Sequence, residues 1–457
     1  MSRIERAVVI GGSIAGLATA ATLSSRAREV VVLERRTTQG RGSVAPQGHL
    51  PHVMLTAGAR ALEELFPGFA EQLVQRGAVV GGADPGRLPC YWVAAGTLRD
   101  HLRLPDLGFS RALCSRALVE ERLRAATLAL PNVSLLDASA EGLEVRRGRE
   151  QHPAVRGVAV RGNAPALEAD LVVDASGRNS RVETWLEAAG LPTPPHSEVV
   201  VDLRYTAFVV DRAPADLEGA AFAVVQNTRD LPRMGVALPM EDDRWQVVLG
   251  GYFGDAAPSD PEGARTFARS LADPALAELL GRHFLEEPSH YTFRSSLHRH
   301  WEKVTPAPHG LCAVGDAVAS FNPIYGQGMS SALLQASTLG RAIDRRGGGP
   351  ALPRAYARAA ARIVANPWLT ATGSDLVYAA TSGDRPPGNA FVNRYVDRVT
   401  RAAAVDESVN AAFTGVQQLL AAPPTLFRPG VVVGALRHGA RHRTPPTPGR
   451  LVLSGRP

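Results

Sequence analysis

The stretch AVVIGGSIAG, residues 7–16, predicts how the N-terminal part of the chain folds. Its first four residues form a short apolar run that is typical of a buried parallel strand, and two glycines close the run. Residues 14–25 are small and suit a helix. A second apolar run, Val30–Leu33, ends in Glu34. The order of strand, glycine turn, helix and strand predicts an α/β domain with a doubly wound parallel sheet.

The glycines of this stretch resemble the dinucleotide-binding pattern G-x-G-x-x-G, with Gly11 and Gly16 in place and Ser13 at the second glycine. Gly11 permits the tight turn, and Gly16 lets the helix pack against the strand. The helix N-terminus then offers free N–H groups and a positive dipole end to a pyrophosphate, to which Ser13 could also donate. Glu34 is placed to accept hydrogen bonds from a ribose. A glycine-rich turn in an unrelated α/β protein is the alternative, whereas a G-x-S-x-G hydrolase elbow is excluded because Ala15 occupies its last glycine position.

A second segment, DASGRNSR at residues 174–181, follows the apolar run 171–173. It resembles the mid-chain motif of flavoprotein hydroxylases, which lies near the FAD pyrophosphate and the nicotinamide route. The form D-x-S-G is similar to the variant of flavin halogenases, isoprenoid reductases and some epoxidases. The alternative is a polar turn in which Arg178 and Arg181 are solvated.

A third segment, GDAVASFNPIYGQGMS at residues 315–330, follows the apolar run 311–314 and resembles the C-terminal flavin motif of group A flavoprotein monooxygenases. The resemblance implies that Asp316 accepts a hydrogen bond from a ribityl hydroxyl and that Pro323 turns the chain across the isoalloxazine. It also implies that Gly326 and Gly328 let the backbone approach the ring. The helix from Met329 would then direct its positive end at the pyrimidine side of the flavin.

The resemblance extends from the N-terminus to the C-terminal helical region and implies the p-hydroxybenzoate hydroxylase fold. It implies further FAD contacts from Arg116, for which a surface arginine is the alternative, and from Arg35, Arg41 and Gln47 after the second strand. Three more segments resemble the squalene-epoxidase-like bacterial epoxidases of polyether and polyketide natural-product biosynthesis, a part of secondary metabolism. These segments are PQGHLPH (46–52), LEELFPG (62–68) and NPW (366–368).

The activity implied by this resemblance is that of an FAD-dependent monooxygenase. NADPH or NADH would reduce FAD, O2 would add at C4a, and the flavin hydroperoxide would epoxidise or hydroxylate an apolar natural-product intermediate. The protein would supply a dry pocket and orientation, so we nominate no catalytic side chain. Candidate substrate-pocket residues are His49, Phe222, Met234, Trp245 and Tyr325, with core packing as the alternative for the last four. We do not interpret His49 and His52 as metal ligands.

Two other functions stay open. A flavin-dependent reductase of isoprenoid-type double bonds fits the segment 174–177, and a non-catalytic flavin or ligand-binding protein would hold FAD without oxidising NAD(P)H. A flavin halogenase is disfavoured, because it needs an early lysine and a W-x-W-x-I-P segment. The only lysine of this chain is Lys303, and no tryptophans have that spacing.

The pattern of apolar runs predicts three parts. Residues 199–254 read as an antiparallel sheet with strands at 199–203, 207–210, 222–225, 235–238 and 245–249. Residues 328–345 and 351–421 suit helices, and Pro367 is expected to break the second stretch. We therefore expect a Rossmann-like FAD-binding domain (1–75, 102–190 and 296–345), an interleaved β-sheet substrate domain (76–101 and 191–295), a C-terminal helical region (346–423) and a basic tail (424–457).

Composition excludes several classes of protein. The chain has 457 residues, is 45% hydrophobic and carries a formal charge of +6. Six arginines and no acidic residue follow Pro424, so the charge lies in a Pro- and Arg-rich end that we expect to be solvated, not in a nucleic-acid-binding face. The three cysteines are far apart and are expected to be reduced core residues. We expect a cytoplasmic monomer or homodimer with no transmembrane segment.

Overall fold

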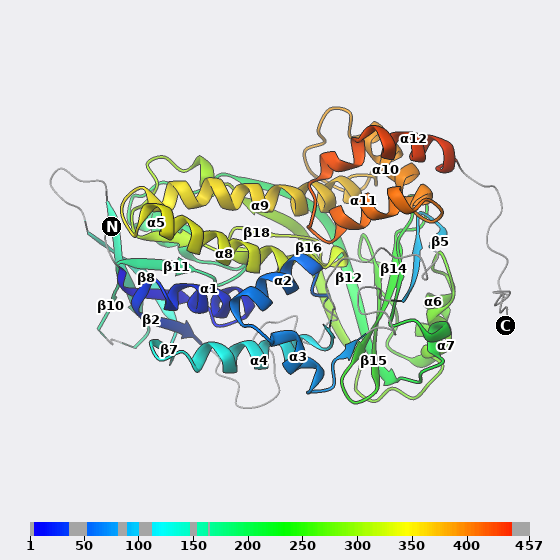
Figure 1. Ribbon diagram of the computed structural model, residues 1–457, viewed down its shortest axis with the longest axis horizontal. Coiled ribbons are helices and arrows are strands. Elements are labelled where there is room, and N and C mark those ends of the chain that lie inside the picture. Colours follow the sequence, from blue (N-terminus) through cyan, green and yellow to red (C-terminus); the bar gives the residue numbers. More distant parts are fainter. Residues whose placement is uncertain are drawn as a thin grey trace.

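The computed structural model describes residues 4–35, 53–80, 89–99, 112–146, 153–162 and 165–440. A parallel sheet with its covering helices lies beside a larger, mostly antiparallel sheet, and a group of C-terminal helices lies over one end of the larger sheet (Figure 1). This is the α/β class with an interleaved sheet that the sequence predicts.

The parallel sheet has five strands in the order β17-β11-β1-β2-β7. Their bounds are β1 Ile4–Ile10, β2 Ala27–Glu34, β7 Val133–Asp137, β11 Leu171–Asp174 and β17 Leu311–Ala313. Every pair in this sheet is parallel. The strands that precede the three predicted flavin segments therefore lie next to one another, and their carboxyl ends meet at one edge.

The two faces of this sheet are covered differently. Val9, Val30 and Val32 face the helices α1 (Ile14–Ser24), α8 (Gly328–Arg346) and α9 (Leu352–Asp375). Val8 and Val31 face helix α5 (Val182–Ala188) and a small sheet of β8 (Ala140–Arg146), β9 (Ala154–Val160) and β10 (Leu167–Glu168). Because both faces are buried, the strands are continuous apolar runs rather than alternating ones.

The larger sheet has eight strands in the order β18-β16-β12-β15-β14-β13-β4-β5. Their bounds are β4 Cys90–Ala94, β5 Thr97–Arg99, β12 His196–Asp211, β13 Phe222–Val225, β14 Arg233–Met240, β15 Arg244–Gly251, β16 Ser289–Arg299 and β18 Ala319–Ser320. The predicted strands 199–203 and 207–210 are one strand, β12, whose pairing with β16 shifts register between Val200 and Leu203. Only β13 and β4 pair in parallel among these described strands.

Alternation along β15 corrects one predicted pocket residue. Trp245, Val247 and Leu249 point to the face covered by α6 (Pro261–Arg269) and α7 (Leu276–Leu279). Trp245 is fully buried there, and its indole N–H donates to Asp216 at 2.8 Å. Trp245 is therefore a core residue, because successive side chains of a strand point to opposite faces.

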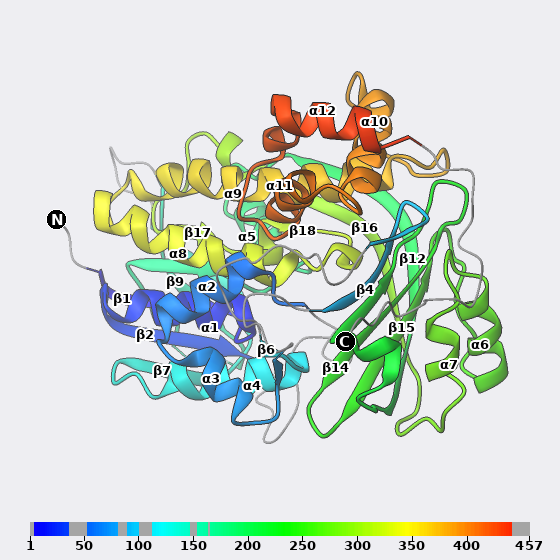
Figure 2. The ribbon, with the colours of Figure 1, turned by 45° about the vertical axis from the view of Figure 1, so that its right-hand side comes forward.

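Smaller elements lie outside the two large sheets. They comprise α2 (Thr56–Leu65), α3 (Phe69–Val74), α4 (Arg116–Leu128), the short pair β3 (Val79–Val80) and β6 (Ala112–Leu113), and single 3-10 turns at Asp216–Gly219, Trp301–Lys303, Gly315–Ala317, Pro323–Tyr325 and Pro423–Phe427. Figure 2 shows α2, α3 and α4 on the side of the parallel sheet. Cys90, Cys114 and Cys312 are buried, and no disulfide joins them in the described part of the chain.

The C-terminal helices differ from the prediction in two respects. Helix α9 runs through Pro367 without a break, because Val364 and Ala371 on either side of it are buried against the flavin-motif segment. The helical region also continues beyond residue 423. Helices α10 (Asn389–Ala402), α11 (Glu407–Gln417) and α12 (Pro429–His438) share a core in which Val431 and Ala435 pack on Val409. Part of the predicted tail is therefore folded.

None of the helices in the described ranges has the length and apolarity that crossing a membrane requires.

Candidate cofactor and active site

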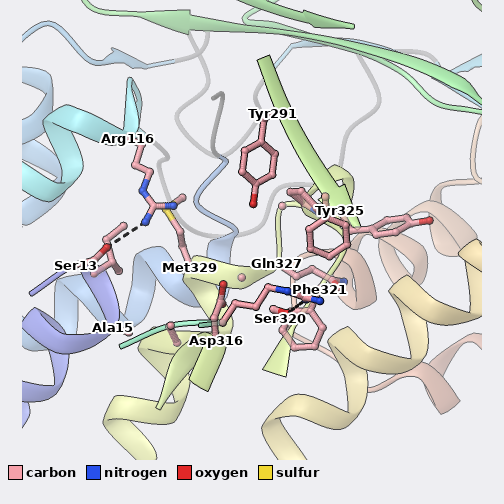
Figure 3. A pocket seen from close by; sticks show the side chains of 18 of the residues that line it. Ser13, Ala15, Arg116, Tyr291, Asp316, Ser320, Phe321, Tyr325, Gln327 and Met329 are labelled. Carbon is pink, nitrogen blue, oxygen red and sulfur yellow. Dashed lines mark hydrogen bonds between the residues drawn. The ribbon is translucent and has the colours of Figure 1, made fainter. Parts of the chain in front are cut away.

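A cavity of about 870 Å³ lies between the two sheets, at the carboxyl ends of β1, β2 and β11. All three predicted flavin segments contribute to its wall. Figure 3 shows Ser13, Arg116 and Met329 on one side, Asp316 below them, and Tyr325 and Phe321 on the other side. Ligands of open α/β sheets bind outside the carboxyl ends of the strands, so the position suits a cofactor.

The first segment forms the expected turn. Gly11 has φ +106°, and a Cβ there would lie 2.5 Å from the carbonyl oxygen of Ala175 on the neighbouring strand. A Cβ on Gly16 would lie 1.8 Å from the carbonyl oxygen of Gly11. Close approach of the main chain therefore requires glycine at both positions. At Gly11 the backbone conformation requires it as well.

Two helix N-termini point at this cavity without a side-chain cap. The N-cap residue of α1 is Ser13 and that of α8 is Gln327, and neither side chain makes a cap hydrogen bond within its described helix. Both residues line the cavity. Free N–H groups with a positive dipole end form a ready anion site, so the cavity offers one site at each helix.

The side chain of Ser13 is engaged elsewhere. Its hydroxyl donates to Glu120, and Arg116 donates to Ser13 Oγ at 3.2 Å and to Glu120 Oε1 at 3.1 Å. Arg116 and Glu120 are both buried, with 8% and 2% exposure. Glu120 was not predicted from the sequence, although it follows Arg116 by four residues, a spacing that places two side chains side by side on a helix.

Glu34 ends β2 at the cavity wall. Its Oε2 accepts the Gly12 N–H at 2.8 Å, which fixes the carboxylate beside the glycine turn. Arg35 also lines the cavity. Arg41, Gln47 and His49 lie outside the described residues.

The second segment is held by its own turn. Asp174 is fully buried and accepts from the Ser176 N–H at 3.0 Å and from the hydroxyls of Ser176 and Ser180. Burial raises the pKa of Asp174, and the serine hydrogen bonds oppose that rise. Arg178 is half-buried and donates to Ser295 Oγ at 2.6 Å and to Ser320 Oγ, and so joins this turn to the larger sheet, whereas Arg181 is exposed.

The third segment crosses the floor of the cavity. Asp316, Pro323, Gly326, Gly328 and Met329 all line it. Burial raises the pKa of Asp316, while the nearby guanidinium groups of Arg116, Arg178 and Arg299 lower it. Gly326 is left-handed with φ +64°, and a Cβ on Gly328 would meet nothing closer than Asp316 Oδ1 at 3.9 Å. The backbone is thus open to a flat ring on this side.

These features fit FAD. The cavity has the size of a cofactor site, two uncapped helix ends can meet pyrophosphate and flavin oxygens, and the buried Oε1 of Gln327 has no hydrogen-bond partner in the described chain. The residues that would hold it are Gly11, Ser13, Glu34, Arg35, Arg116, Asp316, Pro323, Gly326, Gly328 and Met329.

The larger sheet supplies the opposite wall, which is mostly apolar. Phe222, Met234 and Tyr325 line the cavity as the sequence predicted, and Trp92 and Val248 were not predicted. Tyr291 points into the cavity from β16 (Figure 3). This wall excludes water from one side of the site.

A buried polar cluster lies behind Tyr325. Asp375 on α9 is fully buried, and its Oδ1 accepts from Asn322 Nδ2 at 2.9 Å, from Tyr252 OH at 3.0 Å and from Tyr325 OH at 3.2 Å. Its Oδ2 has no partner among the residues that are placed. Burial raises the pKa of Asp375 to about 7. No sequence signal indicates this residue, because α9 reads as an alanine-rich helix.

One other group of possible ligands lies near the site. His298, His300 and Glu302 have ligand atoms within 4.8 Å of one another. Ser197 Oγ and Glu302 each lie 2.8 Å from a ring nitrogen of His300, so hydrogen bonds account for the positions of His300 and Glu302, whereas His298 Nε2 has no hydrogen-bond partner among the described residues.

The parallel sheet, the glycine turn and the shared cavity define a nucleotide-cofactor protein with an interleaved substrate sheet. The chain belongs to the FAD dependent oxidoreductase family, whose model matches residues 6–346. It is 30% identical over 412 residues to "Protein Rv3254" of Mycobacterium tuberculosis (strain ATCC 25618 / H37Rv), and the match covers 85% of each protein.

Solved structures share the fold. PqsL, a probable FAD-dependent monooxygenase from Pseudomonas aeruginosa, matches with a TM-score of 0.58 and 19% identity over 83% of this chain and 99% of its own. The tetrameric form of 2-methyl-3-hydroxypyridine-5-carboxylic acid oxygenase matches with a TM-score of 0.60 and 17% identity over 96% and 98%. At these identities the likeness establishes the fold alone.

Proposed function

We propose that this protein is an FAD-dependent monooxygenase that uses NADPH or NADH and O2 to epoxidise or hydroxylate an apolar natural-product intermediate. The observation that carries the proposal is the composition of one cavity. Two uncapped helix N-termini and Asp316 lie on one side of it, and the apolar wall of the larger sheet lies on the other.

FAD, when bound, supplies both the electron transfer and the activation of O2. The chain's own residues bind and orient the cofactor. When FAD is bound, the α1 N-terminus would hold the pyrophosphate, Glu34 would bind the ribose, and Asp316 would accept a hydrogen bond from the ribityl chain. Met234, Val236 and Val248 keep the reacting side dry, which protects a reactive oxygen species from water.

A reductase of isoprenoid-type double bonds is the second candidate. The turn 174–177 resembles those enzymes, and Ala175, Ser176 and Gly177 border the same cavity. The two functions differ in what the reduced protein does with O2.

The test is a stopped-flow experiment. The flavin is reduced anaerobically with NADPH or NADH and then mixed with O2. A transient absorbance that precedes the oxidised spectrum supports the monooxygenase, and direct return to oxidised flavin at every pH, with and without ligands, supports the reductase. Absence of bound flavin would refute both.

A matched pair of variants tests where the ring lies. Gly328→Leu places a side chain in the cavity, whereas Gly430→Leu makes the same change on α12, where a Cβ meets nothing within 4 Å. We expect Gly328→Leu to purify without flavin and Gly430→Leu to retain it. Equal flavin content in the two would place the ring elsewhere.

A further inference from the structure

A second cavity, of about 920 Å³, lies under the C-terminal helices. We call helices α10–α12, residues 389–438, the cap. The cavity is bounded by the cap above, by Gly373 of α9 and Val377 just after that helix, and by Met234 and the turn at Gly96 of the larger sheet. Its volume is at the upper end of the range for small-molecule sites.

The two cavities share part of their walls. The residues that line both are Val224, Gln226, Met234, Ile324, Tyr325, Thr370 and Gln417. Ile324 and Tyr325 belong to the third flavin segment, whereas Gly11 and Glu34 line only the first cavity. The second cavity therefore adjoins the flavin end of the first, not its adenosine end.

The walls of the second cavity combine apolar and polar side chains. At the junction, Val224, Met234 and Ile324 are apolar, whereas Gln226, Thr370 and Gln417 are polar. The residues that line only the second cavity are again of both kinds, with apolar side chains such as Leu98, Val392 and Phe413 and hydrogen-bonding side chains of the cap such as Asn389, Asn393 and Thr400. A ligand that fills the cavity would therefore be mostly apolar and carry a few hydrogen-bonding groups.

Exposed apolar side chains mark an opening. Leu369, Val405 and Phe427 line the second cavity and are also 53%, 58% and 47% exposed to solvent. Clustered exposed apolar residues next to a cavity are typical of ligand-binding sites.

We propose that the second cavity is the chamber for the bulk of the substrate. Its ligand is an elongated, mostly apolar molecule whose reactive end reaches past Tyr325 to the flavin and whose hydroxyl or carbonyl groups lie beneath the cap. This inference rests on the proposed function for the orientation of the ligand, but binding itself can be measured without turnover.

Gly373 offers a way to fill the chamber. It lies within α9, and a Cβ there would meet nothing closer than the side-chain oxygens of Asn389 and Asn393 at 4.0 Å. Leucine is a better helix former than glycine, so Gly373→Leu should fold and place its side chain in the cavity. Gly430→Leu is the matched control, because Gly430 lines neither cavity.

The probes are geraniol and geranylgeraniol, two apolar alcohols of the same chemistry and different length, titrated into the FAD-loaded protein by calorimetry. We expect the wild type to bind geranylgeraniol more tightly than geraniol. Gly373→Leu should weaken the affinity for geranylgeraniol at least about tenfold, which corresponds to about 1.4 kcal/mol, and should leave the affinity for geraniol unchanged. Gly430→Leu should change neither affinity.

Equal affinity of the wild type for the two probes would refute the proposed chamber. Equal weakening of both affinities by Gly373→Leu would refute it as well. These outcomes are independent of the reaction with O2. If the protein gives the expected affinities but no transient on reaction with O2, the proposal of a substrate chamber stands and the proposed monooxygenase function is refuted.

Discussion

At the scale of single residues, the ion pair of Arg116 and Glu120 fixes the position of the Ser13 side chain. Both side chains are almost fully buried, and Ser13 contacts both of them. A buried pair of this kind contributes little net stability as a whole, but the loss of one partner leaves an uncompensated charge. The pair is therefore better understood as a device that fixes Ser13 at the start of α1.

We expect Arg116→Met to lower the free energy of unfolding by about 3–5 kcal/mol, because the buried Glu120 would lose its ion pair with Arg116. The double variant Arg116→Met with Glu120→Gln should recover most of that loss. Urea unfolding of the flavin-free proteins measures both. A double variant no more stable than the single one would show that packing, not charge, is responsible.

Asp375 provides a prediction about pH. Burial raises its pKa to about 7 in the folded protein, against about 3.9 for an unfolded aspartate. Between these pH values only the folded state retains the proton, so the free energy of unfolding falls as the pH rises through the window. Asp375→Asn should remove this slope, which is at most about 1.4 kcal/mol per pH unit.

The shape of the cluster should survive the substitution, because all three donors bond Oδ1, an atom that asparagine keeps. Asp344→Asn is the control. Its hydrogen bond with Arg26 lowers the pKa of Asp344, so this group titrates below the window. The prediction fails when the wild type and Asp375→Asn show the same slope in urea unfolding from acid to neutral pH.

Residue-level prediction from the sequence succeeded where a motif fixes the backbone. Gly11, Gly16 and Gly326 lie where the patterns place them, because a strained or crowded main chain tolerates only glycine there. It failed for Asp375 and Tyr252, which are far apart in the chain and meet only through tertiary packing. It also failed for Trp245, since an alternating strand does not reveal which face is the cavity face.

At the scale of elements, the contact of α1 with β1 depends on Gly16. A Cβ there would overlap the Gly11 carbonyl, so Gly16→Ala must push the helix away from the turn. We expect a loss of about 1–3 kcal/mol or more of unfolding free energy together with loss of FAD.

Gly430→Ala is the control for this prediction. It makes the same change in a helix with open space around the Cβ, so it should be neutral or stabilising by up to about 1 kcal/mol. Thermal unfolding compares the two. Equal melting temperatures would mean that the turn adjusts without strain.

Strand positions in the two sheets were predictable because apolar runs and alternation are local signals. The continuity of α9 was not, since the intrinsic effect of Pro367 would end a helix in isolation. Burial of Val364 and Ala371 against the flavin-motif segment compensates for the lost hydrogen bond. Helix α12 was missed for a related reason, because its valines acquire a partner only when α11 folds beside it.

At the scale of the whole molecule, hydrogen bonds from the start of helix α2 join the cap to the part of the chain beside the parallel sheet. Gln418 accepts from the Thr56 N–H at 3.0 Å and from its hydroxyl at 2.9 Å, and the Ala57 N–H donates to the Gln418 carbonyl at 3.2 Å. The sequence predicted a helical region after residue 346, but such contacts over long separations have no local pattern. The position of the cap over the second cavity could therefore come only from the structure.

This attachment gives the last prediction. Gln418→Ala would leave the buried N–H and hydroxyl of Thr56 without this acceptor, at a cost of about 1–3 kcal/mol. Because the cap has its own core, we expect the loss to appear as local opening rather than global unfolding. Amide hydrogen exchange should accelerate in α10–α12 and stay unchanged in α1 and α8. Gln417→Ala is the neighbouring control, since Gln417 Oε1 has no hydrogen-bond partner in the described ranges. Acceleration spread evenly over the chain would contradict this prediction and would mean that the cap and the rest of the chain unfold as one unit.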